Sequence, residues 1–433
     1  MSLLRAHPPT PLVAFDHCRI PLKHFAFVGR DDRVARLHQL ALEIDPLAPR
    51  AGGGWKRLVA RLEYLAVTLR QVARYHARWG RHVRRTHGVS LRRQWADAWH
   101  CMWRQNQLAR HYYWRKLFLL PDRAAWLDNL EHRQVNTLLE FFNRHVPATR
   151  IAHKLQFAEH CARHALPTPP VLAAWAEGGK LALGPAADPR CDVFAKPTSD
   201  YGSVGAMPIE FDNRSGEYRF NGTRLQWPGL LDAIAAELAA DRGYLLQPRL
   251  RSSAASAVYG AEELSNVRIV TGRTVRGAPE PIAAVVRIPS SFTTQGHDRD
   301  VMLASIDVHT GRMGPAMFRE ITLPQFSDHP DTGHRIEGEP FPNWPAMLEL
   351  ARRAHATCPW MPFVGWDVVD TDRGLMLLEA NSNWGGDSAQ LPGAPALGRT
   401  RFPEIYLEWF EHLRLGRALP TEMEDAPAAG RLA

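Results

Sequence analysis

The residues best suited to metal chemistry lie in one predicted β-hairpin near the C-terminal end. Two apolar runs, Phe363–Val369 and Leu375–Glu379, flank a five-residue connection rich in turn formers, which predicts two antiparallel strands. Asp367 lies in the first run, Glu379 ends the second, and Asn381 follows two residues later. Oxygen ligands of this kind suit Mg²⁺, which takes its remaining ligands from water and phosphates. These three side chains therefore predict a magnesium–phosphate site.

The predicted register decides whether these side chains meet. A hairpin closed by residues 370–374 pairs Asp367 with Leu377 and Glu379 with Gly365. Side chains alternate along a strand, so the two carboxylates then project from one face as diagonal neighbours. Carboxylates between hydrophobic strands are costly unless a cation neutralises them. The alternative is two unrelated acids, each solvated at a strand end.

The hairpin resembles the metal-binding hairpin of ATP-grasp enzymes, in which an Asp, then a Glu and an Asn two residues apart, hold magnesium ions that bridge the ATP phosphates. The fuller pattern is similar to the sugar-transfer-associated ATP-grasp branch, which is related to α-L-glutamate ligases. The resemblance covers residues 149–386, a little over half of the chain. It implies an α+β ATP-grasp fold whose two subdomains clamp ATP. It also implies that Asp367, Glu379 and Asn381 hold one or two Mg²⁺ ions, for which Mn²⁺ can substitute.

One lysine and a glycine-containing loop are candidates for phosphate binding. The sequence has no GxxxxGKS or GxxxxGKT motif, but a strand-like run delivers Lys196 into a loop with Gly202, Ser203 and Gly205. A point charge and close backbone approach then occur together. The segment resembles the ATP-grasp strand lysine and the glycine loop that closes over the phosphates. The alternative is a solvated lysine at a strand boundary.

Lys154 and the segment Gly243–Leu250 extend the resemblance on the nucleotide side. Lys154 opens a predicted helix over 152–165 that ends before a proline-rich turn, where ATP-grasp proteins place a lysine that reaches the α- or β-phosphate. Gly243–Leu250 is similar to the hinge strand whose backbone binds adenine, with Gln247 and Leu250 as cofactor-binding candidates. The alternatives are a solvated helix lysine and an ordinary buried strand.

Two arginines are candidates for catalysis. Arg268 and Arg287 interrupt the apolar runs Asn266–Thr271 and Pro281–Ile288, and a buried arginine demands an anionic partner. Phosphoryl transfer needs positive charge on the γ-phosphate as its bond breaks. Some ATP-grasp ligases place an arginine two residues before the metal-binding Asp, where this chain has Gly365, and the resemblance favours Arg268. The alternative for each arginine is an internal salt bridge.

A turn-prone segment supplies two candidates for contact with substrate. His329 and Asp331 match an HPDTG pattern of the family, and they are suited to position an acceptor or to transfer a proton. A turn held by Asp and Gly explains the same residues without catalysis.

Composition describes an ordinary globular protein with a local excess of positive charge. The 433 residues predict two or three structural units, and 45% of residues are hydrophobic and 23% charged. Five scattered cysteines without CxxC pairs predict reduced thiols, and no 18-residue apolar run or signal sequence is visible, so we expect a cytoplasmic protein. The net charge of +8 comes largely from Arg74–Lys116, which holds eleven basic residues and one acid.

Periodicity divides the chain into a helical part and an α+β part. Residues 31–144 are typical of helices, and short β-rich runs mixed with helices follow. The predicted divisions are a helical Arg/Trp-rich N-terminal region (1–148), an N-terminal ATP-grasp part (149–250), a C-terminal ATP-grasp part with the metal hairpin (251–414) and a flexible tail (415–433).

Three tryptophans recur every four residues within the basic region. Trp95, Trp99 and Trp103 predict one buried helix face with arginines on the solvated opposite face, so Trp99→Ala is expected to cost about 3 kcal/mol or more. The alternative is binding of nucleic acid, acidic polysaccharide or an anionic lipid surface.

The resemblance implies an ATP-dependent carboxylate–amine ligase that acts through an acyl phosphate. Its expected partners are small-molecule, peptide or sugar-linked carboxylates and amines. Two other readings remain open: a phosphotransferase acting on a hydroxyl, and a non-catalytic protein that binds nucleic acid through the basic helices. Neither the two substrates nor the oligomeric state follows from the residues.

Overall fold

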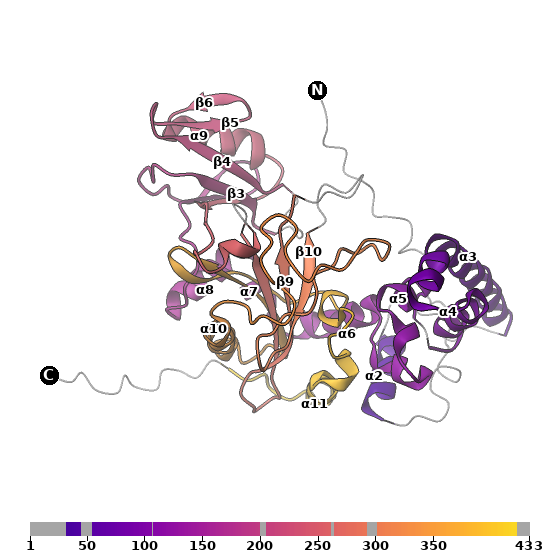
Figure 1. Ribbon diagram of the computed structural model, residues 1–433. Helices are drawn as coiled ribbons and strands as arrows, with labels where there is room; N and C mark the ends of the chain where they lie inside the picture. The colour runs from indigo at the N-terminus through magenta and orange to yellow at the C-terminus, as the bar shows by residue number, and fades with distance from the viewer. Residues whose placement is uncertain are drawn as a thin grey trace.

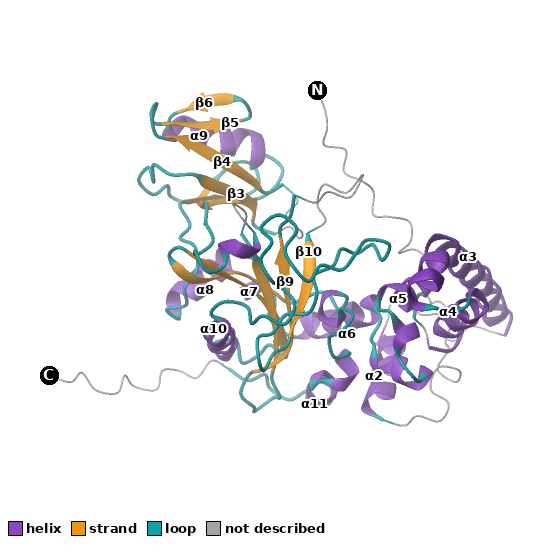
Figure 2. Cartoon of the chain, in the orientation of Figure 1, coloured by secondary structure: helices purple, strands orange, loops and turns teal. Residues whose placement is uncertain are grey.

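Two antiparallel sheets and a helical N-terminal region make up the part of the chain that the structure describes (Figure 1). This computed structural model describes residues 32–44, 54–105, 107–199, 205–260, 264–291 and 301–421. Helices α3, α4 and α5 gather at one end of the molecule and strands β3–β6 with α9 at the other, with the second sheet between them (Figure 1). Figure 2 shows that strands are confined to the part that follows the helical region.

The elements of the described residues have the following bounds. The α-helices are α2 (Arg33–Ile44), α3 (Gly54–His87), α4 (Leu91–Gln105), α5 (Ala109–Trp114), α6 (His132–His145), α7 (Thr149–Ala152), α8 (Lys154–Arg163), α9 (Trp227–Ala233), α10 (Trp344–Ala356) and α11 (Phe402–Arg414). The strands are β1 (Ala173–Trp175), β2 (Leu181–Leu183), β3 (Val193–Pro197), β4 (Met207–Asp212), β5 (Glu217–Phe220), β6 (Thr223–Leu225), β7 (Tyr244–Pro248), β8 (Asn266–Gly272), β9 (Glu280–Ile288), β10 (Met302–Ile306), β11 (Phe363–Thr371) and β12 (Gly374–Asn381). Short helical turns are η3 (Leu117–Leu119), η4 (Arg123–Asp128), η5 (Ile234–Leu238), η6 (Ala257–Tyr259), η7 (Ser388–Gln390) and η8 (Leu397–Arg399).

The sheet topology confirms the α+β prediction. The first sheet has seven strands in the order β2-β1-β7-β3-β4-β5-β6, the second has five in the order β10-β9-β8-β11-β12, and neighbouring strands in both are antiparallel. The predicted runs at 266–271 and 281–288 are β8 and β9. The prediction missed β1, β2 and β4–β6, because β1 and β2 have only three residues each and β4–β6 carry exposed charged residues that break the apolar pattern.

The five-stranded sheet packs different elements on its two faces. On one face, Val267, Trp366 and Val368 join a buried core that includes residues of α8 and α10. On the other, Val270 and Phe363 join a core with residues of α6 and α11. Because side chains alternate along a strand, residues with the parity of Arg268 and Asp367 lie on this second face.

The tryptophan prediction for α4 was wrong. Its buried side chains are Gln94, Asp97, Ala98, Cys101, Met102 and Gln105, whereas Trp95 is 37% exposed and Trp99 and Trp103 are partly buried. The buried residues and the tryptophans both recur at helical spacing. Each tryptophan comes one position after a buried residue, so the two sets face different sides of the helix. Periodicity alone therefore did not distinguish the buried face.

Close packing of α3 against α4 decides which face is buried. Gly80 of α3 lies so near α4 that a Cβ there would meet Gln94 at 3.2 Å, so small and slender side chains fit best at this contact. Gln94 donates to the carbonyls of Gly80 and Val89, and Asp97 accepts from Tyr112 and Arg123. The buried polar atoms that make these bonds are thereby satisfied, and the broad indoles are left at the rim, where Trp99 and Trp103 stack.

The arginines of the region do not form one solvated face. Arg92 and Arg93 are exposed, but Arg93 lies 3.5 Å from buried Asp97, and Arg110 binds Asp387 from the other end of the chain. Within the described residues no helix combines the length and apolar character needed to cross a membrane.

Candidate nucleotide and metal site

The hairpin predicted to hold the metal is present as β11 and β12, but its predicted turn and register were wrong. Strands β11 and β12 are joined by only two residues, and Thr371 pairs with Gly374. Asp370 is not a turn residue: it is buried and accepts hydrogen bonds from Ser253, Ser256 and Asn343. These partners make the strand conformation of Asp370 favourable, so the hairpin is longer than the turn-forming sequence indicated.

A β-bulge brings the two carboxylates directly opposite each other. Val368 pairs with Leu377 and Asp367 pairs with Glu379, so Leu378 has no partner in the ladder. In the register set by the turn alone, Glu379 would lie opposite Trp366 and point toward the core beneath α10. The extra residue reverses the facing of the residues that follow it, which places Glu379 on the face of Asp367. The predicted diagonal contact is thus a direct cross-strand pair.

Arg268 holds Asp367 in a two-pronged ion pair. Its Nε and Nη2 donate to the two carboxylate oxygens at 2.7 and 2.8 Å, and Asn266 Nδ2 donates to Oδ2 at 3.1 Å. Nη1 of Arg268 donates to the Trp384 carbonyl at 3.2 Å. Burial opposes ionisation of Asp367, but Arg268 outweighs it and holds the pKa of the carboxyl below its usual value.

Glu379 lies between several cations and a like charge. Its oxygens are 3.8 Å from Lys154 Nζ and 3.8 Å from Arg268 Nη2, and it accepts from Asn381 Nδ2 at 3.3 Å. Burial and the neighbouring Asp367 charge raise the pKa of Glu379 above its usual value. A divalent cation between the carboxylates would relieve this repulsion.

The two predicted phosphate lysines are brought to the same place. The backbone NH of Lys154, at the start of α8, donates to the Thr198 carbonyl just beyond β3, which carries Lys196. Burial lowers the pKa of Lys196 to about 8, although Glu379 partly offsets the effect. A desolvated lysine beside a second lysine is a strong electrostatic site for an anion.

Arg287 differs from Arg268 in its partners. Asn266 pairs with Arg287 across β8 and β9, so Arg287 lies on the site face of the sheet. It makes no hydrogen bond or ion pair with another described residue, and burial together with Arg268 lowers the pKa of its guanidinium. The internal salt bridge considered for both arginines therefore forms for Arg268 and not for Arg287 within the described chain.

The donor set fits a magnesium ion shared with a phosphate. A carboxylate offers about four acceptor sites, and Asp367 uses three of them, so one remains. Glu379 and the Asn381 amide oxygen lie beside it on β12. The site supplies only two acids, and the described residues, this site included, hold no group of three or more His, Cys, Asp or Glu placed to bind a metal. A set of only three protein ligands is compatible with Mg²⁺, because this ion takes its other ligands from water and phosphate.

The other residues predicted to bind the nucleotide lie in β7, just after it and in the segment that precedes β4. Gln247 lies in β7, and its side chain donates to the Pro169 carbonyl at 2.9 Å, while Leu250 follows the strand and is partly buried. Gly205 has φ +79°, and its carbonyl accepts from Tyr244 at 3.0 Å. Gly202 and Ser203 lie outside the described residues.

His329 and Asp331 lie in a turn that packs against the residues just after β9. The His329 ring binds the Pro289 carbonyl at 2.9 Å and accepts from the Asp331 backbone NH at 3.1 Å. Asp331 accepts from the backbone and side chain of Ser291. These contacts account for both residues as turn formers, and their role toward substrate stays a prediction.

Two contacts of the site were missed by sequence reasoning. Asn266 binds Asp367, and it lies two residues before Arg268, the spacing that puts both side chains on one strand face. This signal was present in the sequence. The Trp384 carbonyl had no such signal, because any residue supplies a carbonyl.

Several solved structures match this chain at low identity and with low TM-scores. N5-carboxyaminoimidazole ribonucleotide synthetase from Thermotoga maritima is 12% identical with a TM-score of 0.33, over 68% of this chain and 59% of that chain. D-Alanine-D-alanine ligase from Helicobacter pylori is 11% identical with a TM-score of 0.35, over 60% and 61%. L-amino acid ligase from Bacillus licheniformis is 8% identical with a TM-score of 0.29, over 54% and 41%. The chain thus spans less than two thirds of the length of each.

No curated protein matches the chain. A family model described as sugar-transfer associated ATP-grasp matches residues 133–402, which begin at α6 and include both sheets and the hairpin. This match covers more than half of the 433 residues. The chain belongs to the sugar-transfer-associated ATP-grasp family.

Proposed function

We propose that this protein is an ATP-dependent carboxylate–amine ligase that uses Mg²⁺ and an acyl-phosphate intermediate. Membership of the ATP-grasp family supports the use of ATP. The observation that carries the proposal is the convergence of Asp367 and Glu379 with Lys154, Lys196 and Arg268 on one face of the second sheet. Paired acids among several cations suit a metal–triphosphate complex better than they suit a folded core.

Each side chain has a distinct task in this proposal. Lys154 and Lys196 bind phosphate oxygens of ATP, and Gln247, Leu250 and the glycine loop at 202–205 belong to its binding site. Asp367, Glu379 and Asn381 would hold Mg²⁺, which when bound neutralises phosphate charge. Arg268 binds Asp367 and thereby orients this carboxylate toward the metal. Arg287 lacks a described anionic partner and is therefore the arginine more available to the transferring phosphoryl group.

The proposed reaction has two steps. A carboxylate oxygen of the first substrate attacks the γ-phosphorus of ATP, the bond to the β-phosphate oxygen breaks, and ADP leaves. The amine of the second substrate then attacks the acyl carbon, loses a proton and expels inorganic phosphate. Cations around the transferring group stabilise charge that develops in the first step. The substrates are proposed to be a small-molecule, peptide or sugar-linked carboxylate and amine, and a cytoplasmic location stays a prediction.

Hydroxylamine trapping tests the ligase proposal. Purified protein is incubated with MgATP, candidate carboxylates and hydroxylamine, and hydroxamate and ADP are measured. Equal amounts of hydroxamate and ADP are expected, because hydroxylamine intercepts an acyl phosphate. A stable phosphate ester without hydroxamate would identify a phosphotransferase instead. RNA binding that weakens steeply with salt, without ATP binding, would favour the nucleic-acid reading.

A further inference from the structure

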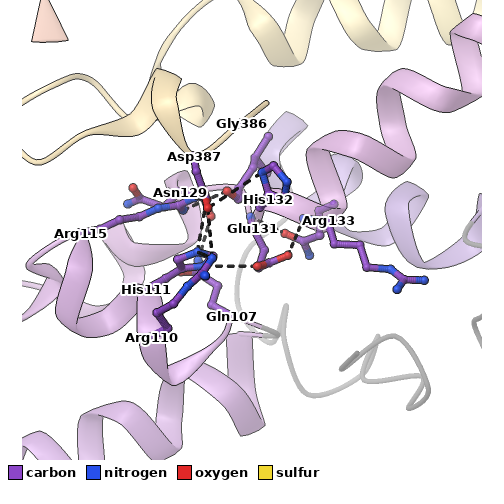
Figure 3. A network of polar contacts seen from close by, with 12 residues as sticks. Gln107, Arg110, His111, Arg115, Asn129, Glu131, His132, Arg133, Gly386 and Asp387 are labelled. Atoms are coloured by element: carbon purple, nitrogen blue, oxygen red, sulfur yellow. Dashed lines mark hydrogen bonds and ion pairs between the residues drawn. The ribbon is translucent and has the colours of Figure 1, made fainter. Parts of the chain in front are cut away.

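Buried polar side chains join the helical N-terminal region to the loop that follows the metal hairpin (Figure 3). Asp387 of this loop accepts from Arg115 Nη2 at 2.9 Å and from Arg110 Nη2 at 3.2 Å. His111 places Nε2 3.2 Å from Asp387 and Nδ1 3.3 Å from Glu131. We refer to these five residues as the Asp387 clasp. The four clasp residues from the helical region all precede residue 133, where the family match begins.

Most of the clasp is buried, although the side chain of Arg110 is 43% exposed. The side chains of His111 and Arg115 are 0% and 1% exposed, and that of Asp387 is 14% exposed. Burial opposes ionisation of Asp387, but His111 and Arg115 hold the pKa of the carboxyl well below its usual value. Burial lowers the pKa of His111, whose ring lies between the carboxylates of Asp387 and Glu131. Such networks often contribute less to stability than apolar packing, so another role has to be considered.

The loop between the clasp and the hairpin contacts Arg268. The Trp384 carbonyl accepts from Arg268 Nη1 at 3.2 Å, and only Gly385 and Gly386 separate Trp384 from Asp387. Gly385 has φ +77°, and a Cβ on Gly386 would lie 2.6 Å from Val135 of α6. Two glycines restrain a backbone weakly, so the direction of the Trp384 carbonyl depends on the contacts that hold this loop. These are the contacts of Asp387, the bond from Gln390 Nε2 to the Gly386 carbonyl at 3.0 Å and the packing of the buried Trp384 indole.

We infer that the Asp387 clasp is a positioning element of the catalytic site, through which the helical region sets the orientation of Arg268. Arg115 and His111 fix Asp387, Asp387 fixes the end of the loop, and the Trp384 carbonyl then holds the third nitrogen of the Arg268 guanidinium. The other two nitrogens bind Asp367, so the clasp also steadies the proposed metal ligand. Arg115 ties the same assembly to the Leu130 carbonyl at 2.9 Å. This inference rests on the function proposed above.

Matched variants separate positioning from general stability. Asp387→Asn keeps the shape of the side chain but removes its charge, and Arg115→Met removes its main partner. The control is Asp128→Asn, which breaks an ion pair to Arg399 at 2.7 Å between the same two parts of the chain without touching residues 382–387. MgATP turnover, the KM for ATP, the Tm and amide hydrogen exchange of residues 382–391 are measured in each.

Asp387→Asn should lower kcat on the order of 10- to 100-fold and leave the KM for ATP within about twofold, because the phosphate lysines are untouched. Exchange of residues 382–391 should become faster in this variant and remain unchanged in Asp128→Asn. The double variant Asp387→Asn/Arg115→Met should regain much of the Tm, since no buried charge is left alone, but not the turnover.

Two results would overturn the inference. One is turnover that recovers with Tm in the double variant, because a merely structural clasp restores both together. The other is unchanged exchange in Asp387→Asn, which would mean that packing of the Trp384 indole suffices to hold the loop. A wild-type protein that neither binds nor consumes MgATP would instead refute the proposed function, and the exchange comparison would still decide whether the clasp positions the loop.

Discussion

The metal hairpin and helix α4 show how differently a periodic pattern performs in two parts of one chain. In the hairpin, the prediction that Asp367 and Glu379 share one face was right, but a β-bulge rather than simple alternation puts them there. In α4, a four-residue repeat marked Trp95, Trp99 and Trp103 as the core face, and the structure buries Ala98, Cys101 and Met102 instead. Acids inside an apolar hairpin are costly, so their presence alone is informative. Indoles are tolerated both in a core and at its edge, so the spacing of tryptophans does not show which helix face is buried.

The largest effect is expected from exchanging the residue at the bulge with its neighbour. In the double variant Leu378→Glu/Glu379→Leu, a leucine lies opposite Asp367 and the carboxylate lies at the unpaired bulge position, so turnover should be abolished. Steady-state kinetics measures the effect. The substitution Leu378→Ala, which leaves Glu379 opposite Asp367, is the control and should retain activity.

Neutralising Glu379 tests the hairpin without moving it. Glu379→Gln should lower kcat on the order of 100-fold or more while the protein stays folded, because the amide has lost the charge that would help to hold Mg²⁺. Asp367→Asn should lose activity and also stability, about 3–5 kcal/mol, since Arg268 would be left buried without its partner. Full activity of Glu379→Gln at ordinary magnesium would refute the metal assignment.

The pH dependence of ATP binding tests the desolvated lysine. Lys196 has a pKa lowered to about 8 by burial, so it loses its charge as pH rises through 8. If ATP binds only the charged form, its KM should rise about fivefold between pH 8 and pH 9. Lys196→Arg stays charged and should show a flat profile over this range. A flat profile in the wild-type protein would show that Lys196 does not bind phosphate.

The smallest effect is expected from the tryptophans at the rim. Trp99→Ala should lower the free energy of unfolding by about 1–1.5 kcal/mol, less than the burial prediction required, because the ring is only partly buried. Trp126, which is 1% exposed in the same region, should cost about 3–5 kcal/mol when replaced by alanine. Urea denaturation of both variants measures the difference. Equal losses of unfolding free energy in the two variants would support the prediction that Trp95, Trp99 and Trp103 form a buried helix face.

The sequence by itself determined the α+β class and the family, and it predicted most members of the candidate site. Chemistry restricts residue type, so Asp367, Glu379, Asn381 and the two lysines were recognisable without coordinates. Strands β8 and β9 were also predicted from the sequence, because their long apolar runs leave few alternatives to a buried strand.

Only the tertiary structure decided the register, the buried face of α4 and the Asp387 clasp. A bulge depends on hydrogen bonds between two strands, and here Asp370 is held in the strand by Ser253 and Asn343, which are distant in sequence. The buried face of α4 depends on the shape of α3 beside it. Asp387 meets Arg115 across 272 residues of chain, and no local pattern can encode a contact between such separated side chains. Residue types can be read locally, whereas contacts depend on how the whole chain packs.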